Sequence, residues 1–113
     1  MNDCLFCKMV AGDIKPAVVY ENEHVLAFRD IRPQAPNHVL VIPKKHIPTL
    51  DDLAPDEAAL GGELLLAVQQ VARLENLADG YRTVINCRSN AGQELYHLHL
   101  HVLGGRRLTW PPG

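Results

Sequence analysis

The sequence predicts an α+β fold in which an antiparallel sheet of about five strands packs with one long and one short helix. Three observations support this prediction. Several short segments are apolar or alternate in polarity, as strands do. One longer segment, residues 55–77, repeats its apolar residues with the helical period. Short loops join most of the strands, which favours antiparallel pairing. The length of 113 residues suits a single domain, residues 1–113.

The first half of the chain predicts a short helix and three strands. Residues 4–11, "CLFCKMVA", form the helix, which a glycine then stops. The segment "AVVYENEHVLAFRD", residues 17–30, predicts two strands around a tight turn at Asn22, because asparagine tolerates the left-handed conformation. Residues 38–43, "HVLVIP", predict a short apolar strand that ends at its proline.

The long helix is predicted over residues 55–77. Pro55 suits its first position, and two acidic residues follow at the positive end of the helix dipole. Gly61 and Gly62 cost about 1 kcal/mol each relative to alanine. Either another backbone approaches closely there, or the glycines lie on an ordinary surface. The expected apolar stripe consists of Leu60, Leu64, Ala67, Val68, Val71 and Leu74.

The last two strands are predicted at residues 81–87 and 97–105, joined by the polar loop 88–96. Both helices are expected on one face of the sheet.

Composition excludes several classes of protein. Apolar residues make up 47% of the chain, too many for a disordered segment, and the net charge of −2 offers no basic face for nucleic acid. No apolar run approaches the ~20 residues of a membrane span. The first ten residues lack the features of a signal peptide, and an odd count of three cysteines argues for a reducing compartment. We therefore expect a cytoplasmic protein without membrane or nucleic-acid partners.

Three histidines, His97, His99 and His101, alternate along the last predicted strand and share one face. Imidazole serves as a zinc ligand, as a nucleophile and as a general acid or base. Neighbouring positions on one strand face are ~6–7 Å apart. Ligands of one zinc ion are nearer ~3–3.5 Å apart. A division of roles along the row is therefore easier than one shared ion. The residues between them are expected in the core: Leu98, Leu100 and Val102.

The segment "HLHLHVLGGR" resembles the histidine triad motif of the HIT family, in which three histidines alternate with apolar residues. Residues 28–47, 80–87 and 92–106 and the ending "WPPG" are similar to the Hint branch, the histidine triad nucleotide-binding proteins. The resemblance covers essentially the whole chain. It implies a HIT-like fold and a homodimer that binds purine nucleotides and hydrolyses the P–N bond of nucleoside phosphoramidates such as adenosine 5'-phosphoramidate.

The resemblance also implies residue roles. His99 would attack the α-phosphorus to form a histidine–nucleotidyl intermediate, His101 would hydrogen-bond the phosphate, and His38 would orient the triad. Developing charge would be taken up without a catalytic metal by protonated His101, by backbone N–H groups near Gly92 and by Asn86. The nucleotide would be bound by Asp30, Ile31, Asn86, Gly92, Gln93, Glu94, His99 and His101.

Three positions, Asp30, Glu94 and Ala91, have an alternative interpretation or depart from the family pattern. Asp30 offers two acceptor oxygens to a ribose cis-diol, but read alone it is an ordinary turn residue before Pro33. Glu94 stands where eukaryotic members often have serine, which puts a side-chain contact with the leaving amine in question. Ala91 stands where glycine is frequent in the family, a departure that stiffens the loop.

Cys4 and Cys7 have the spacing of half a zinc site, with His46 and His97 as candidates for the other ligands. The resemblance implies the same set, because many HIT proteins with this cysteine pair bind a structural zinc in that way. The alternative is two buried thiols that pack a helix on the sheet.

The ending "LTWPPG" and the two helix glycines are features that a homodimer could use. The resemblance implies helices packed across a two-fold axis, with Trp110 of one subunit over the partner's pocket. Two other functions stay open: a purine nucleotide-binding module without turnover, and a dinucleoside polyphosphate hydrolase of another HIT branch. The complete triad and His38 favour the phosphoramidase.

Overall fold

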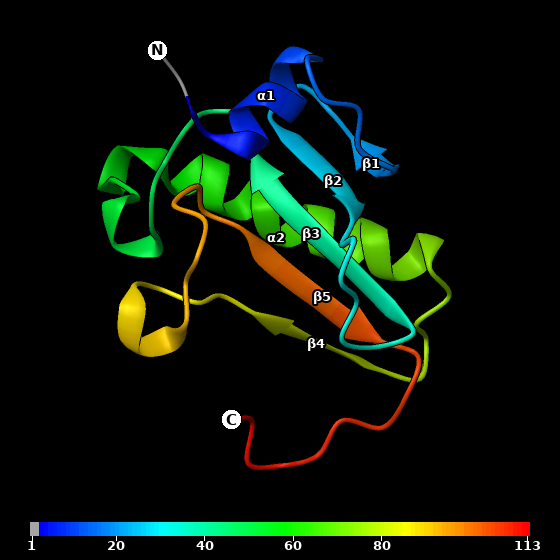
Figure 1. Ribbon diagram of the computed structural model, residues 1–113. Helices are drawn as coiled ribbons and strands as arrows, with labels where there is room; N and C mark the ends of the chain where they lie inside the picture. Colours follow the sequence, from blue (N-terminus) through cyan, green and yellow to red (C-terminus); the bar gives the residue numbers. More distant parts are fainter. Residues whose placement is uncertain (1–2) are drawn as a thin grey trace.

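The computed structural model describes residues 3–113 (Figure 1). Met1 and Asn2, inside the predicted domain, lie outside the described residues. Five strands form one sheet in the order β1-β2-β3-β5-β4, and every neighbouring pair is antiparallel. The prediction of an α+β fold with about five antiparallel strands is confirmed.

The elements follow the predicted order with shorter bounds. The helices are α1 (Leu5–Ala11) and α2 (Ala58–Leu74), and short 3-10 turns cover Leu50–Asp52, Pro55–Glu57 and Ser89–Ala91. The strands are β1 (Val18–Glu21), β2 (Val25–Arg29), β3 (Asn37–Pro43), β4 (Tyr81–Val84) and β5 (Leu100–Gly104).

Helix α2 is shorter than the predicted 55–77. It begins at Ala58, because Pro55–Glu57 form a 3-10 turn before it, and it ends at Leu74 before Asn76 takes a left-handed conformation. Leu74 is 54% exposed, so the predicted stripe is wrong at its last member. The buried stripe consists of Leu64, Ala67, Val68, Val71 and Ala72.

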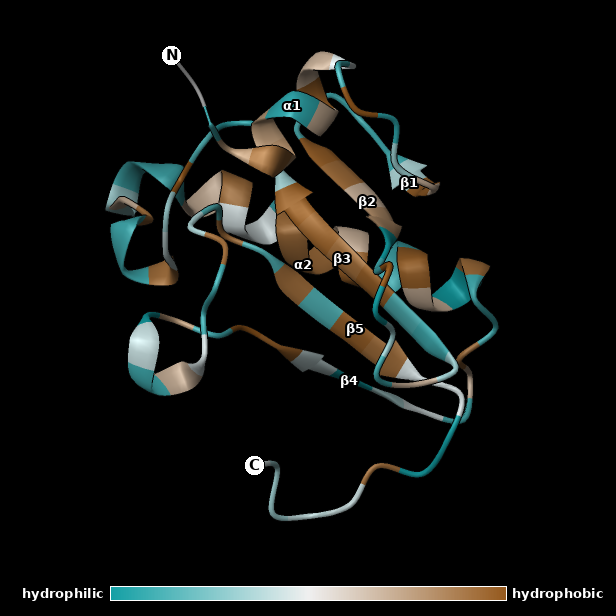
Figure 2. Cartoon of the chain, in the orientation of Figure 1, coloured by the Kyte–Doolittle hydropathy of each residue, from teal (hydrophilic) through white to brown (hydrophobic). Residues whose placement is uncertain are grey.

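The two helices cover opposite faces of the sheet, which corrects the expectation of one face. Alternate residues of β2 and β3, such as Val25 and Val41, pack with α2, whereas Leu26 and Leu40 pack around Phe6 of α1. The reason is that both central strands are apolar on both sides, as Figure 2 shows for β3. Each apolar face of the sheet then needs a helix that shields it from water.

The histidine row lies on the α1 face. Strand β5 pairs with β3 so that His101 is opposite Leu40, a residue of the α1 side. Leu98, Leu100 and Val102 belong to the core under α2, which confirms the predicted alternation. The regular strand is shorter than 97–105, because the amide of Leu98 donates to the carbonyl of Ile47 at 2.6 Å and ladder pairing begins at Leu100.

The other edge strand also ends early. β4 stops at Val84, so Asn86 and the rest of the predicted 81–87 segment already belong to the loop. Among residues 3–113, neither helix has the length and apolarity needed to cross a bilayer.

Candidate active site and metal centre

A chain of hydrogen bonds fixes the protons on two imidazoles, the buried His38 and the half-buried His101. The backbone amide of Gln34 donates to Nδ1 of His38 at 3.0 Å, so neutral His38 carries its proton on Nε2. That nitrogen is 2.9 Å from Nδ1 of His101 and donates to it. Neutral His101 therefore carries its own proton on Nε2. We call Gln34 N–H, His38 and His101 the histidine relay.

Electrostatics keeps the relay neutral. Burial, with smaller contributions from neighbouring His99 and His38, lowers the pKa of His101 to about 4. Burial also lowers the pKa of His38, although the nearby Asp30 carboxylate opposes this shift. Near neutral pH both rings are thus uncharged, which corrects the expectation of a protonated His101. His101 is a hydrogen-bond donor without a formal charge.

His99 has the opposite tautomer. Its Nδ1 is 2.7 Å from the carbonyl oxygen of His97, which can only accept, so Nδ1 carries the proton. Nε2 of His99 then holds a free lone pair. The ring is 5.2 Å from the ring of His101 and 5.3 Å from that of Phe6, between centroids, and meets both edge to face. A nucleophilic nitrogen and a donor ring are therefore neighbours.

The side chain of Asp30 lies next to His38 in the histidine relay. Its Oδ1 accepts the amide of Arg32 at 2.8 Å, so the turn interpretation is correct, and its Oδ2 is 3.4 Å from Nε2 of His38. Next to it, Ile31 is 90% exposed and free to cover a planar ligand. One residue thus holds the turn with one oxygen and faces the relay with the other.

The loop before the histidines is held by Gln93, whose side chain is buried. Its amide donates to the carbonyls of Pro48 and Leu95 and accepts from the amide of Arg88. Arg88 has φ 69° and ψ −174°, a conformation that costs a non-glycine residue on the order of 1–3 kcal/mol. The strained turn depends on these bonds.

The expectation for the backbone N–H groups near Gly92 needs correction. The amides of Ala91, Gly92 and Gln93 all donate to carbonyls inside the loop, so they are not available to a phosphate in this conformation. The side chain of Glu94 is exposed and lines a cavity of about 260 Å³ together with Leu95, Tyr96 and the start of α1. Asn86 is half-buried.

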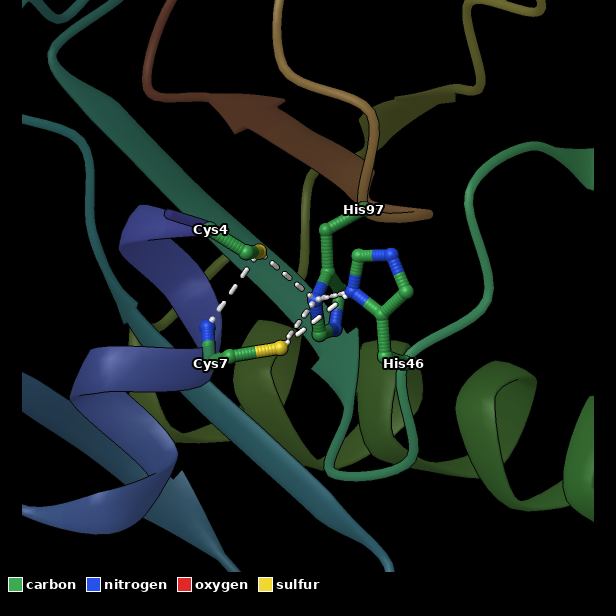
Figure 3. A group of neighbouring side chains, drawn as sticks. All are labelled: Cys4, Cys7, His46 and His97. Atoms are coloured by element: carbon green, nitrogen blue, oxygen red, sulfur yellow. Dashed lines mark hydrogen bonds between the residues drawn. The ribbon is translucent and has the colours of Figure 1, made fainter. Parts of the chain in front are cut away.

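The four candidate metal ligands come together at the N-terminal end of the histidine row (Figure 3). The four ligand atoms of Cys4, Cys7, His46 and His97 all lie within 4.8 Å of one another. Nδ1 of His97 is 3.3 Å from Sγ of Cys4 and 3.5 Å from Sγ of Cys7. It is also 3.3 Å from Nδ1 of His46. We call these residues the four-ligand cluster.

The donor set fits zinc. Tetrahedral bonds of 2.3 Å to sulfur and 2.0–2.1 Å to nitrogen give separations of about 3.5 Å between S and N and about 3.4 Å between two N atoms. Nε2 of His97 faces the carbonyl of Pro43 at 2.8 Å and donates to it, so its Nδ1 presents a lone pair to the cluster. Burial lowers the pKa of His97 and favours the neutral form that binds metals.

Comparison with known proteins agrees with this geometry. A model of the HIT domain matches residues 11–108. The chain belongs to the HIT family. An uncharacterized HIT-like protein of Synechococcus elongatus is 51% identical over 111 residues, covering 98% of this chain and 97% of its own. One from Synechocystis is 49% identical with the same coverage.

Solved structures of HIT proteins superpose closely. A HIT family hydrolase from Legionella pneumophila has a TM-score of 0.95 and 54% identity, with 98% of this chain and 100% of that chain covered. A histidine triad protein from Clostridium difficile has a TM-score of 0.92 and 40% identity, with 96% of both covered. The chain therefore has the fold of a HIT family hydrolase.

Three features of this HIT domain were missed by sequence reasoning. The amide of Gln34 and the carbonyl of Pro43 set the tautomers of His38 and His97, and the ring of Phe6 packs between the cluster and His99. Backbone partners leave no mark in the sequence. For Phe6 the sequence offered one weak indication of a role, which is its position between Cys4 and Cys7.

The C-terminal tail is joined to β4 through Arg82. Arg82 donates to the carbonyl of Leu108 at 3.4 Å, and its guanidinium carbon lies 5.9 Å from the centre of the Trp110 ring. Trp110 itself is 79% exposed. Within one chain, the tail thus presents a large aromatic surface that is hardly covered.

Proposed function

We propose that this protein is a nucleoside phosphoramidase of the Hint branch, which hydrolyses the P–N bond of adenosine 5'-phosphoramidate-type substrates. The observation that carries the proposal is the pattern of hydrogen bonds that assigns opposite tautomers to His99 and His101. A free nitrogen lone pair next to a neutral N–H donor suits attack on a phosphorus centre and support of its oxygens.

In the first step, Nε2 of His99 forms a bond to the α-phosphorus and the P–N bond breaks. The bridging nitrogen takes a proton and leaves as the amine. The nucleotidylated imidazole is cationic, and its Nδ1–H bond to the carbonyl of His97 becomes stronger as charge develops. Nε2–H of His101 donates to a non-bridging oxygen throughout.

In the second step, water attacks the same phosphorus and the bond to His99 breaks. The nucleoside monophosphate leaves with the water oxygen, the imidazole returns to its neutral form, and the water releases one proton. That proton balances the one taken by the amine. Dividing the reaction in this way replaces one difficult displacement by two easier ones.

The nucleoside half of the substrate would lie over Ile31 and Asp30. The exposed side chain of Ile31 offers an apolar surface to a purine, and one oxygen of the Asp30 carboxylate would accept a ribose hydroxyl. Arg32 already occupies Oδ1 of Asp30, so Oδ2 is the oxygen with room for a new donor. Gln93 would act by holding the loop, because its amide is committed to backbone groups.

One structural zinc ion would be held by Cys4, Cys7, His46 and His97. When bound, the ion would tie α1 to the loop after β3 and to the histidine row. Its four ligands leave no open position for a substrate, so catalysis would use no metal.

Two copies of the chain would form a homodimer. Leu65 and Leu66 of α2 are 63% and 59% exposed, and β4 has an unpaired edge. A cavity of about 380 Å³ lies between the end of α2 and Tyr81. A second copy related by a two-fold axis would cover this surface and let Trp110 approach the partner's pocket.

A turnover assay separates the candidate functions. We expect the purified protein to hydrolyse adenosine 5'-phosphoramidate faster than diadenosine polyphosphates, with AMP as product. Sedimentation on the same sample should give a dimer at micromolar concentration. Tight AMP binding without hydrolysis would favour the binding module, and preference for the polyphosphate would favour another HIT branch.

A further inference from the structure

We propose that the four-ligand cluster positions the nucleophile, so that metal occupancy sets the orientation and tautomer of His99 through the carbonyl of His97 and the ring of Phe6. Only the expected effect on kcat rests on the proposed function. Such positioning gives the metal centre a part in catalysis beyond holding the fold. His97 and Phe6 are positioning residues here, because neither reaches the reacting atoms.

The first link is His97, which belongs to both sites. Its Nδ1 faces the cluster, while its backbone carbonyl accepts the proton-bearing Nδ1 of His99 at 2.7 Å. This single bond decides which nitrogen of His99 keeps the lone pair. Any shift of the His97 backbone therefore reaches the nucleophile directly.

The sheet alone does not fix that carbonyl. Regular pairing of β5 begins at Leu100, so His97 lies before the ladder. Its anchors are the bond from Nε2 to the carbonyl of Pro43 and the bond from the next amide, Leu98, to the carbonyl of Ile47. The third anchor is the cluster itself. Metal ligation would thus supply a large part of the restraint on His97.

The second link is Phe6, which sits in the sequence between the two cysteine ligands. Its buried ring meets the ring of His97 at 5.8 Å and that of His99 at 5.3 Å, between centroids, at 77° and 82°. A metal that holds Cys4 and Cys7 also holds the first turn of α1. The edge-to-face contact then keeps the plane of His99 in place.

Without a metal, the ligand atoms are joined only by hydrogen bonds among thiols and ring nitrogens, and thiol groups are weak donors and acceptors. The two Nδ1 atoms of His46 and His97 are 3.3 Å apart, and that of His97 carries no proton to share, since its proton is on Nε2. Such a set is stable around a cation and relaxes without one. His46 is exposed and free to turn outward, which would loosen His97 on one side.

The test compares zinc-loaded protein, zinc-stripped protein and four variants by ¹⁵N NMR of the imidazoles, which needs no substrate. His46→Ala removes one exposed ligand, and His46→Cys replaces it by another. Phe6→Leu keeps all four ligands but loses the ring. His24→Ala, at an exposed histidine outside both sites, is the matched control.

We expect a single Nδ1–H tautomer for His99 in the loaded protein and in His24→Ala. The stripped protein and His46→Ala should show averaging between tautomers, with kcat for adenosine 5'-phosphoramidate at least about tenfold lower and KM within about threefold. Zinc should restore the stripped protein, and His46→Cys should restore both measurements. Phe6→Leu should bind zinc yet show partial averaging.

A stripped protein that melts cooperatively, with His99 resonances and kcat unchanged, would overturn the proposal. Where the stripped protein does not fold, Phe6→Leu decides, because unchanged resonances and kcat in that loaded variant would equally overturn it. A loaded protein with the expected resonances but no turnover of any phosphoramidate would instead refute the proposed function and leave the positioning intact.

Discussion

The histidine relay and the four-ligand cluster lie on the same face of the sheet, and each brings two imidazoles close together. The nearest ring nitrogens are 2.9 Å apart in the relay and 3.3 Å apart in the cluster. In the relay, the backbone amide of Gln34 forces one ring to donate to the other. In the cluster, the carbonyl of Pro43 forces the lone pair of His97 inward, where two sulfur atoms also converge.

The backbone partner of each imidazole, more than the residue type, therefore decides its chemistry. Asp30, His38 and His101 also have ligand atoms within 4.8 Å of one another. They are nevertheless a poor metal site, because Nδ1 of His38 is occupied by an amide and its Nε2–H points at His101. A donor–acceptor chain and a set of converging lone pairs require opposite arrangements of protons.

The largest expected effect is at His99, which lies between the two groups. We expect His99→Ala to lower kcat/KM for adenosine 5'-phosphoramidate by about 10³-fold or more, because no other described group offers a free nitrogen at that place. AMP should still bind within about threefold of its wild-type Kd, as measured by calorimetry. His24→Ala is the control. Activity of His99→Ala within tenfold of wild type would remove His99 as the nucleophile.

The second prediction is that the four-ligand cluster binds zinc and the histidine relay does not. We expect elemental analysis to give one zinc per chain, and Cys7→Ser to lose most of it, with a melting temperature lower by about 10 °C or more. Cys87→Ser is the matched control for a half-buried cysteine outside the cluster. His38→Gln should leave the zinc content unchanged. Zinc-free protein from a purification without chelator would count against the site.

The third prediction concerns pH and the relay. The pKa of His101 is about 4 in the folded state, below the value of about 6.5 expected in the unfolded chain. Between these values the unfolded chain binds more protons, so acid favours unfolding. The stability is complete above about pH 6.5 and falls by about 3 kcal/mol as the pH drops to about 4.

Denaturant titrations of wild type and His101→Gln at several pH values measure this effect. The variant keeps the cluster, so any loss of metal in acid affects both proteins and cancels in the difference. We expect the wild type to lose more stability than the variant between pH 6.5 and 4. Parallel curves would show that His101 titrates normally in the folded protein.

Much of the fold follows from local patterns. The alternation of the histidine row predicted which residues enter the core, because Leu98, Leu100 and Val102 pack under α2. The period of α2 predicted its buried stripe as far as Val71. It was wrong at Leu74, which is 54% exposed, whereas Ala72 and Leu77 on either side of it belong to the core.

The arrangement of the helices and of the sites was less predictable. β2 and β3 are apolar on both faces, which implies that a helix must pack on each face of the sheet. The sequence alone did not give the order of the strands, which is needed to draw that conclusion. The four-ligand cluster could be named from the cysteine pair and the resemblance, and the structure brings those residues together. That a metal binds there stays a prediction.

The smallest expected effect is at the C-terminal tail, which belongs to neither histidine group but borders their face. Val84 is opposite His101 in the sheet, so Arg82, two residues earlier, points to the same side and holds the tail through Leu108. Deleting residues 108–113 removes an exposed segment that makes few bonds. The melting temperature should therefore change by less than about 3 °C.

Leaving-group preference should change more than stability in that deletion. Trp110 is exposed within one chain, and in the proposed dimer it would contact the amine portion of a substrate in the partner's pocket. We expect the ratio of kcat/KM for an aromatic amine to that for unsubstituted phosphoramidate to fall about three- to tenfold. Trp110→Ala should reproduce most of the change, while zinc content and the tautomer of His99 stay as in wild type. Equal ratios for every amine tried would show that the tail lies outside the substrate site.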